Sequence, residues 1–240
     1  MPHKLKKIWE LNKMQFEGFL PEALRFLQDL QVNNNDKEWF ETRRVEYESL
    51  ILNPMRKLVM DLSPTMLNID PEIEIRPVIN KTISKIYRDT RFSKDKSVFR
   101  TNMWINFKRP SPGWHDMPSW WIEIKPEGYT YGMGFYQASA TTMQVFRDRI
   151  ESDQAGFRQV IDFFPGRPRF RLEGDMYKRR FNYFLPGDIQ KWYQRKNMYL
   201  ICKRPNDDIL FSGELVEYIS KRFTELAPLY QYWLEVSLAD

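Results

Sequence analysis

The amino-acid sequence predicts an α+β fold: a single domain with a mainly antiparallel central sheet, flanked by N-terminal and C-terminal helices. Two observations support this fold class. Apolar residues recur at helical spacing before residue 70 and after residue 140, whereas between these regions they alternate with polar residues as in strands. No repeat, low-complexity tract or linker divides residues 1–240, so we expect one domain, with residues 1–15 frayed.

The N-terminal region is expected to form consecutive helices. Residues 19–30 carry apolar side chains on one helical face, and Pro21 suits a first turn. The asparagines at positions 33–35 end this helix and offer an N-cap to the next one. Asp36 and Glu38 then fall in the first turn of that second helix, where carboxylates favour the helix dipole.

Prolines delimit the helical region. Pro54 is expected to kink the second helix or to begin a third one. Pro64 and Pro71 are expected to close the helical region. Further along, residues 102–107 alternate between apolar and other side chains, which predicts a strand.

A β-hairpin is predicted next. Residues 120–125 and 129–135 both alternate at period two, and Pro126-Glu127-Gly128 supplies the turn between them. Gly132 and Gly134 fall on the face of the return strand opposite its apolar residues. The missing side chains would let a backbone or a ligand approach closely there.

The C-terminal half is expected to contain both helices and short strands. In chain order the predicted elements are helices at 141–151 and 155–164, the second ended by Pro165-Gly166, a strand around 170–172, a helix at 188–194, a strand at 198–202, and a final helical region capped by Ser212 with a last segment after Pro228.

The chain contains a single cysteine, Cys202, so no intramolecular disulfide can form. Its apolar neighbours favour a small buried residue over a nucleophile. The first ten residues lack the apolar core of a secretory signal, and no apolar run approaches the ~20 residues that span a bilayer. We therefore predict a cytoplasmic protein without a membrane partner.

Familiar catalytic motifs are missing from the sequence. Gly132-Met133-Gly134 lacks the third glycine of a dinucleotide-binding loop. With only His3, His115 and one cysteine, a His/Cys zinc site is excluded, and we expect neither a metal nor a cofactor. His115 is expected to be an exposed loop residue rather than a general base.

Positive charge is concentrated in one segment. The chain has a net charge of +5, yet residues 81–109 contain nine lysines and arginines against two aspartates. The remainder of the chain is therefore slightly acidic, and the positive field is local.

The centre of this segment is the basic loop, residues 88–100, and we expect it to bind an anionic ligand that carries a phosphate or carboxylate group. Arginine offers a planar fork to such groups, and lysine adds point charge. The loop should lie over the sheet near the hairpin glycines. The predicted anion-binding residues are Arg88, Arg91, Lys94, Lys96 and Arg100, with Lys85, Asp89, Asp95 and Glu123 in supporting roles. If the protein is an enzyme, these cations would stabilise charge in a transition state.

A second hypothesis is structural. Asp89 and Asp95 lie between the cations, so the basic loop could be a salt-bridge clasp in a non-catalytic scaffold or interaction protein.

A third hypothesis is a nucleic-acid-binding module that also uses a second basic cluster. Its cations are Arg167, Arg169, Arg171, Lys178, Arg179 and Arg180, and its interleaved aromatic residues are Phe170, Tyr177, Phe181, Tyr183 and Phe184. We expect these aromatic residues to be buried in the core, next to a solvent-exposed basic edge, and not to stack on nucleic-acid bases.

The basic loop resembles the signature of a bacterial family of conserved hypothetical proteins, known only as a domain of unknown function. The matching residues are Arg88, Asp89, Arg91, Phe92, Asp95 and Lys96. Lys85 stands where the family has arginine, and Phe99 where it has tyrosine. A catalytic role of that tyrosine would not transfer to this chain.

Other segments resemble the same family, including residues 19–47 and the hairpin from Ile124 to Tyr136. The similarity thins after about residue 180. The resemblance implies family membership and a single domain, and it implies no activity.

Overall fold

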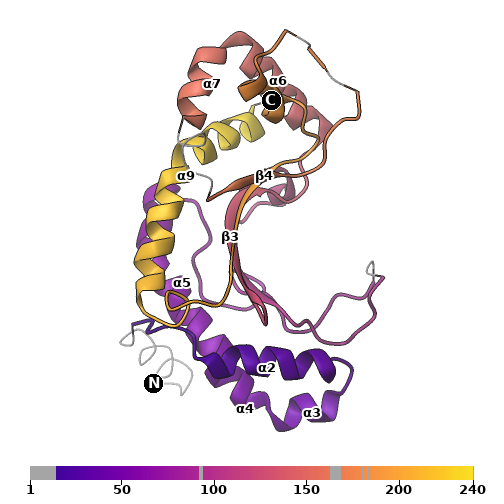
Figure 1. Cartoon of the computed structure of the whole chain (residues 1–240), viewed down its shortest axis with the longest axis vertical. Coiled ribbons are helices and arrows are strands. Elements are labelled where there is room, and N and C mark those ends of the chain that lie inside the picture. Colours follow the sequence, from indigo (N-terminus) through magenta and orange to yellow (C-terminus); the bar gives the residue numbers. More distant parts are fainter. Residues whose placement is uncertain (1–14, 92–93, 163–168, 180, 183, 240) are drawn as a thin grey trace. The chain divides into compact units, whose positions relative to one another are not determined.

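The α+β prediction is confirmed by a computed structural model, which describes residues 15–91, 94–162, 169–179, 181–182 and 184–239 (Figure 1). Among these residues, five strands form an antiparallel sheet in the order β1-β2-β3-β5-β4. Helices from the N-terminal and C-terminal parts of the chain flank the sheet. The expected fraying of residues 1–15 lies almost entirely outside the described residues.

The chain divides into two compact units, each assembled from segments that are separate in sequence. The first unit comprises Met1–Phe107, Trp121–Thr130 and Lys203–Lys221, and the second comprises Lys108–Trp120, Tyr131–Cys202 and Arg222–Asp240. Both hairpin strands and the last helix contribute residues to both units. That residues 1–240 fold as one domain stays a prediction.

In the first unit, α2 (Pro21–Val32) begins at Pro21, as predicted. The N-cap of α3 (Lys37–Thr42) is Asp36, whose side chain accepts a hydrogen bond of 2.9 Å from the backbone N–H of Trp39. The prediction that an asparagine caps this helix is therefore wrong by one position. Aspartate is as good an N-cap as asparagine, so the sequence alone did not separate them.

Pro54 lies in the first turn of α5 (Asn53–Ile69), which follows α4 (Arg44–Tyr47) and a π-helical turn, η1 (Glu48–Leu52). Pro64 lies inside α5, so the prediction that it closes the helical region is wrong. An interior proline costs about 3 kcal/mol, but Met66 and Ile69 beyond it are buried. Burying two such side chains stabilises the continued helix by about 3–6 kcal/mol, which outweighs that cost.

The first three strands in the chain lie where the sequence predicts them: β1 (Met103–Phe107), β2 (Pro118–Lys125) and β3 (Gly128–Phe135). The apolar residues of β1 are buried, and α5 contacts this strand. Trp104 on the opposite face of β1 stays half-buried. In β1 the period-two pattern therefore correctly separates the core face of the strand from its other face.

The remaining elements also follow the predicted order. They are α6 (Ala140–Ser152), α7 (Gln154–Ile161), β4 (Arg171–Glu173), α8 (Gly187–Tyr193), β5 (Tyr199–Arg204) and α9 (Glu214–Leu238). The predicted stop at Pro165-Gly166 lies outside the described residues. The expectation of a separate segment after Pro228 is wrong, because α9 continues through this proline with Leu226, Leu229 and Tyr230 all buried.

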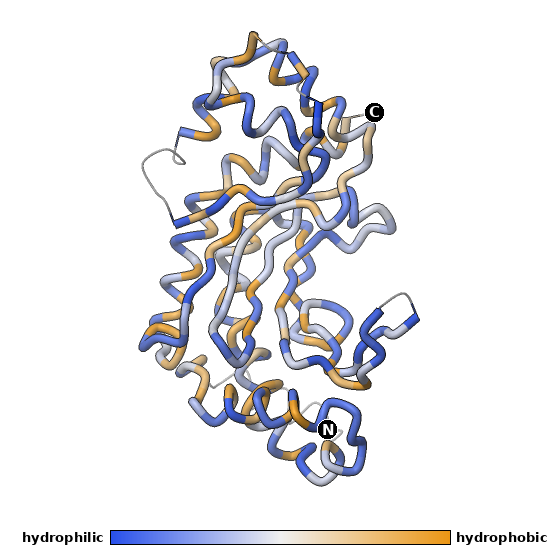
Figure 2. Tube along the Cα trace, turned by 45° about the vertical axis from the view of Figure 1, so that its right-hand side comes forward, coloured by the Kyte–Doolittle hydropathy of each residue, from blue (hydrophilic) through white to orange (hydrophobic). Residues whose placement is uncertain are grey.

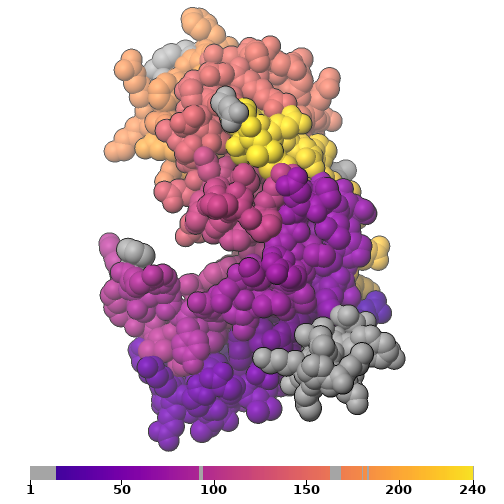
Figure 3. Space-filling view, turned by 180° about the vertical axis from the view of Figure 1, so that it is seen from behind, coloured from indigo at the N-terminus to yellow at the C-terminus, as the bar shows by residue number. Residues whose placement is uncertain are grey.

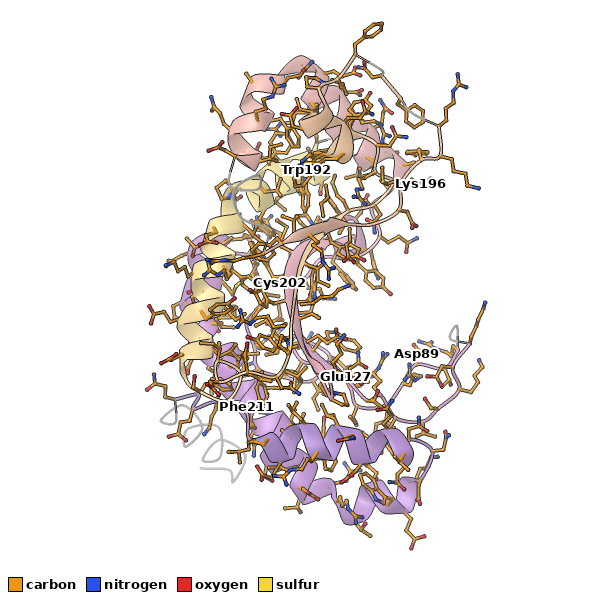
Figure 4. The ribbon with its side chains drawn as sticks, viewed as in Figure 1. Asp89, Glu127, Trp192, Lys196, Cys202 and Phe211 are labelled. Carbon is orange, nitrogen blue, oxygen red and sulfur yellow. The ribbon has the colours of Figure 1, made fainter. Side chains whose placement is uncertain are left out.

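Close backbone approach explains one glycine of β3. A Cβ atom on Gly134 would lie 2.3 Å from the Cβ atom of Tyr199 in β5, so a larger residue cannot fit. The neighbour at this glycine is thus the protein's own backbone. Cys202, on β5 (Figure 4), is buried as predicted.

None of the described helices is both long enough and apolar enough to cross a bilayer.

Candidate functional site

The basic loop forms the end of an antiparallel excursion, here called the arm (residues 86–100). Its two sides are joined by backbone hydrogen bonds from Arg88 N–H to the Val98 carbonyl (2.9 Å) and from Arg100 N–H to the Ile86 carbonyl (2.8 Å). The arm projects from the first unit as a lobe in Figure 3, and it is mostly hydrophilic in Figure 2. Phe92 and Ser93 lie outside the described residues.

The base of the arm is anchored to the N-terminal helices. Phe99 is fully buried and stacks on Phe40 with ring centroids 4.5 Å apart. The backbone N–H of Phe99 donates to the carbonyl of Asn34 (2.9 Å), and that of Val98 donates to the side-chain oxygen of Asn35 (3.2 Å). The asparagine turn that ends α2 therefore also holds the arm.

Arg91 is paired within the arm. Its Nε and Nη2 atoms donate to the two carboxylate oxygens of Asp89 at 3.0 and 2.7 Å. These hydrogen bonds lower the pKa of Asp89 from its ordinary value of 3.8 to about 2. Figure 4 shows Asp89 on the arm, where both side chains are largely exposed.

Arg88 and Lys96 are paired within the arm as well. Arg88 lies 3.1 Å from the Asp95 carboxylate through Nη2 and donates from Nε to the Ser97 hydroxyl at 3.0 Å. Asp95 also accepts the backbone N–H of Ser97, a bond that lowers the pKa of Asp95. Lys96 donates from Nζ to the carbonyl of Thr90 at 2.6 Å.

The other predicted cations are placed differently. Lys94 and Lys85 are exposed. Arg100 lies with its guanidinium 4.6 Å from the ring centroid of Trp104, and its positive charge contributes to the lowered pKa of Asp89. Arg100 thus links the arm to strand β1.

Glu123 is held on the face of the sheet opposite the core. One carboxylate oxygen accepts a hydrogen bond from the side chain of Asn102, and the other accepts one of 3.1 Å from the hydroxyl of Thr130. We call Arg100, Asn102, Trp104, Glu123 and Thr130 the polar sheet face. All of them belong to the first unit.

Sequence reasoning found only part of this set. It named Arg100 and Glu123 and missed Asn102, Trp104 and Thr130. The alternation of residues 102–107 already placed Asn102 and Trp104 opposite the core, and this signal could have found them.

Asn106 occupies the same side of that alternation. Its side-chain oxygen is buried, and no described residue donates a hydrogen bond to it. A buried oxygen without a donor is costly, so a bound molecule or water would stabilise this position.

A metal-binding set is not found in the part of the chain that the structure describes, where no three His, Cys, Asp or Glu side chains gather. The predicted proximity of the basic loop to Gly132 and Gly134 stays a prediction, because these glycines belong to the second unit.

The second basic cluster is only partly described, since Arg167, Arg180 and Tyr183 lie outside the described residues. Phe170 is buried, as expected for a core residue. Phe181 and Phe184 are 39% and 97% exposed, so the prediction that they belong to the core is wrong. Both residues lie outside helices and strands. The sequence around them shows no periodic spacing of apolar residues from which their burial could be predicted.

The sequence was compared with models of known protein families. The sequence model of the family described as Conserved hypothetical protein (DUF2461) matches residues 22–232. No curated protein matches the chain. The match covers most of the sequence and confirms the predicted family. The chain therefore belongs to the DUF2461 family of conserved hypothetical proteins, a family of unknown function.

Proposed function

We propose that this protein binds a small phosphate- or carboxylate-bearing ligand on the polar sheet face, and that the arm is a structural clasp that positions Arg100. The proposal is supported by a difference in the contacts that the cations make. Within the arm, Arg88 forms an ion pair with Asp95, Arg91 donates to Asp89 and Lys96 donates to the Thr90 carbonyl. Arg100 instead lies over Trp104 on the sheet.

The clasp has a physical rationale. A polar excursion of this length loses much conformational entropy on ordering and has little apolar surface to bury. Single exposed ion pairs contribute little, but several local bonds together restrict the chain. The buried Phe99 at the base then fixes the direction in which the arm leaves the helices.

The polar sheet face has the chemistry for a polyfunctional anion. A guanidinium presents a planar fork to phosphate or carboxylate, and its stacking on Trp104 restricts its orientation. Glu123, held by Asn102 and Thr130, can accept a hydrogen bond from a ligand hydroxyl or amine. The ligand class is therefore an anion that also carries hydrogen-bond donors, such as a sugar phosphate or a hydroxy acid.

A thermal-shift panel of inorganic phosphate, sugar phosphates and hydroxy acids tests this function. We expect a saturable rise in Tm for wild type, and an apparent affinity about 10- to 100-fold weaker for Arg100→Ala, since a hydrogen bond to a charged group contributes ~1.5–3 kcal/mol. Glu123→Gln should weaken sugar phosphates more than inorganic phosphate. Arg25→Ala, an exposed arginine on α2, is the matched control and should bind as wild type.

The proposal fails if no member of the panel raises Tm, or if Arg100→Ala responds as wild type does. We also propose that the protein is bacterial and cytoplasmic. Cell fractionation tests the cytoplasmic location.

A further inference from the structure

Three aromatic rings gather on the surface of the second unit, on residues that the proposed ligand site does not use. Trp114 and His115 stack with centroids 4.0 Å apart. Tyr136 lies 5.5 Å from Trp114 and 5.7 Å from His115. Tyr136 is 66% exposed, although tyrosine normally buries most of its ring.

The backbone beneath these rings is fixed. Asp116 accepts hydrogen bonds from the N–H of Ser139 (2.6 Å) and the hydroxyl of Thr142 (2.7 Å), which ties the loop to the start of α6. The N–H of Gln137 donates to the carbonyl of His115 at 2.9 Å. The rings are therefore presented on an ordered surface, which lowers the entropic cost of binding a ligand.

A positive charge accompanies the rings. The Nζ atom of Lys108 lies 3.1 Å from the ring centroid of Trp114. Burial lowers the pKa of Lys108 to about 8, and the electron-rich ring face favours the ammonium form in return. At neutral pH the group is therefore mainly a cation.

We propose that Lys108, Trp114, His115 and Tyr136 form a nucleotide-binding site, in which the base stacks on the exposed aromatic rings and the phosphate is neutralised by Lys108. An aromatic ring accepts any base, because every base has a π-face, and cations beside such rings track phosphate. The base and phosphate belong to a free nucleotide or to a single-stranded nucleic acid. The residues of this site belong to the second unit, and none of them is part of the polar sheet face.

Calorimetric titration of the full chain with AMP, adenosine, ribose 5-phosphate and a single-stranded adenine oligonucleotide tests the proposal. We expect AMP to bind more tightly than adenosine or ribose 5-phosphate. Tyr136→Ala and His115→Ala should each weaken AMP about 5- to 100-fold, the range for loss of one stacking ring. Lys108→Gln should weaken AMP while leaving adenosine unchanged.

Two control variants distinguish binding at this site from nonspecific binding to any exposed ring or charge. Phe184→Ala removes a 97% exposed ring of the same unit, and Lys178→Gln removes an exposed charge. Both should bind AMP as wild type does, and unchanged Tm values for the exposed-ring variants show that they are folded.

The two sources of the ligand give different results, and each supports the site. An oligonucleotide that binds far more tightly than AMP, with affinity that falls steeply with salt, indicates a single strand. Equal affinities indicate a free nucleotide. The proposal is overturned if neither AMP nor the oligonucleotide binds, if ribose 5-phosphate binds as tightly as AMP, or if Tyr136→Ala and His115→Ala both bind as wild type does.

Discussion

Asp89 shows how one carboxylate orders a basic segment. It accepts two hydrogen bonds from the guanidinium of Arg91 and lies within the field of Arg100. The sequence predicts that the charges of the basic loop share one role, either as an anion-binding site or as a salt-bridge clasp. Only the geometry of the arm decides which donors point at which carboxylates, because an irregular loop has no fixed period from which the directions of its side chains could be read.

The ion pair between Asp89 and Arg91 should make the stability of the fold depend on pH in the acidic range. The pKa of Asp89 in the folded protein, about 2, lies below its ordinary value of 3.8, so the pair stabilises the fold above that ordinary value. This contribution is lost as pH falls through the folded-state pKa. We expect Asp89→Asn to have a lower Tm than wild type at pH 6, and the gap to close between about pH 4 and pH 2.

Melting curves followed by circular dichroism across this pH range measure the gap. Asp208→Asn, at an exposed position, is the control and should show no gap that varies with pH. A gap for Asp89→Asn that stays constant down to pH 2 would show that the Arg91 pair does not act through charge.

At the level of the elements, period and burial explain both the successes and the errors of the sequence analysis. The burial of residues along β1 and in most of β2 follows the predicted period of two, whereas all residues of β3 are buried. Pro64 is predicted to close the helical region and Pro228 to precede a separate last segment, yet both prolines lie inside helices. Helix ends depend on whether the residues beyond the proline are buried, and this is decided by tertiary packing that no local pattern contains.

Gly134 is the element-level position where a small change should matter most. An added Cβ would lie 2.3 Å from Tyr199 Cβ, so Gly134→Ala forces β3 and β5 apart. We expect it to lower the free energy of unfolding by about 1–3 kcal/mol, the usual cost of overpacking.

Urea unfolding measures this difference. Gly187→Ala is the control, because nothing lies within 4 Å of the Cβ that it would add, and alanine is favoured over glycine in a helix. It should leave stability unchanged or raise it. Equal effects of the two variants would contradict the explanation of Gly134.

For the whole molecule, the sequence predicts one domain, and the arrangement of the chain favours cooperative unfolding. Each unit is built from three separate segments, and β2, β3 and α9 contribute to both. We expect circular dichroism and tryptophan fluorescence to report one coincident transition, with equal calorimetric and van't Hoff enthalpies. Two separated transitions would contradict the one-domain prediction.

The candidate site was predictable in part. Residue types and charge density pointed to residues 88–100, and the alternation along β1 placed polar groups opposite the core. The pairing of Arg88 with Asp95, the stacking of Arg100 on Trp104 and the contact between Asn102 and Glu123 join residues 4 to 21 positions apart through side-chain geometry. Such contacts follow from tertiary structure, which spacing in the sequence does not fix.

A double-mutant cycle on Arg88 and Asp95, measured by urea unfolding, tests most directly whether the arm is a clasp. The account predicts that Asp95→Ala destabilises wild type slightly more than it destabilises the Arg88→Ala variant, because its partner is already gone in that variant and one partly exposed ion pair contributes little. Strictly additive effects of the two substitutions would contradict the clasp.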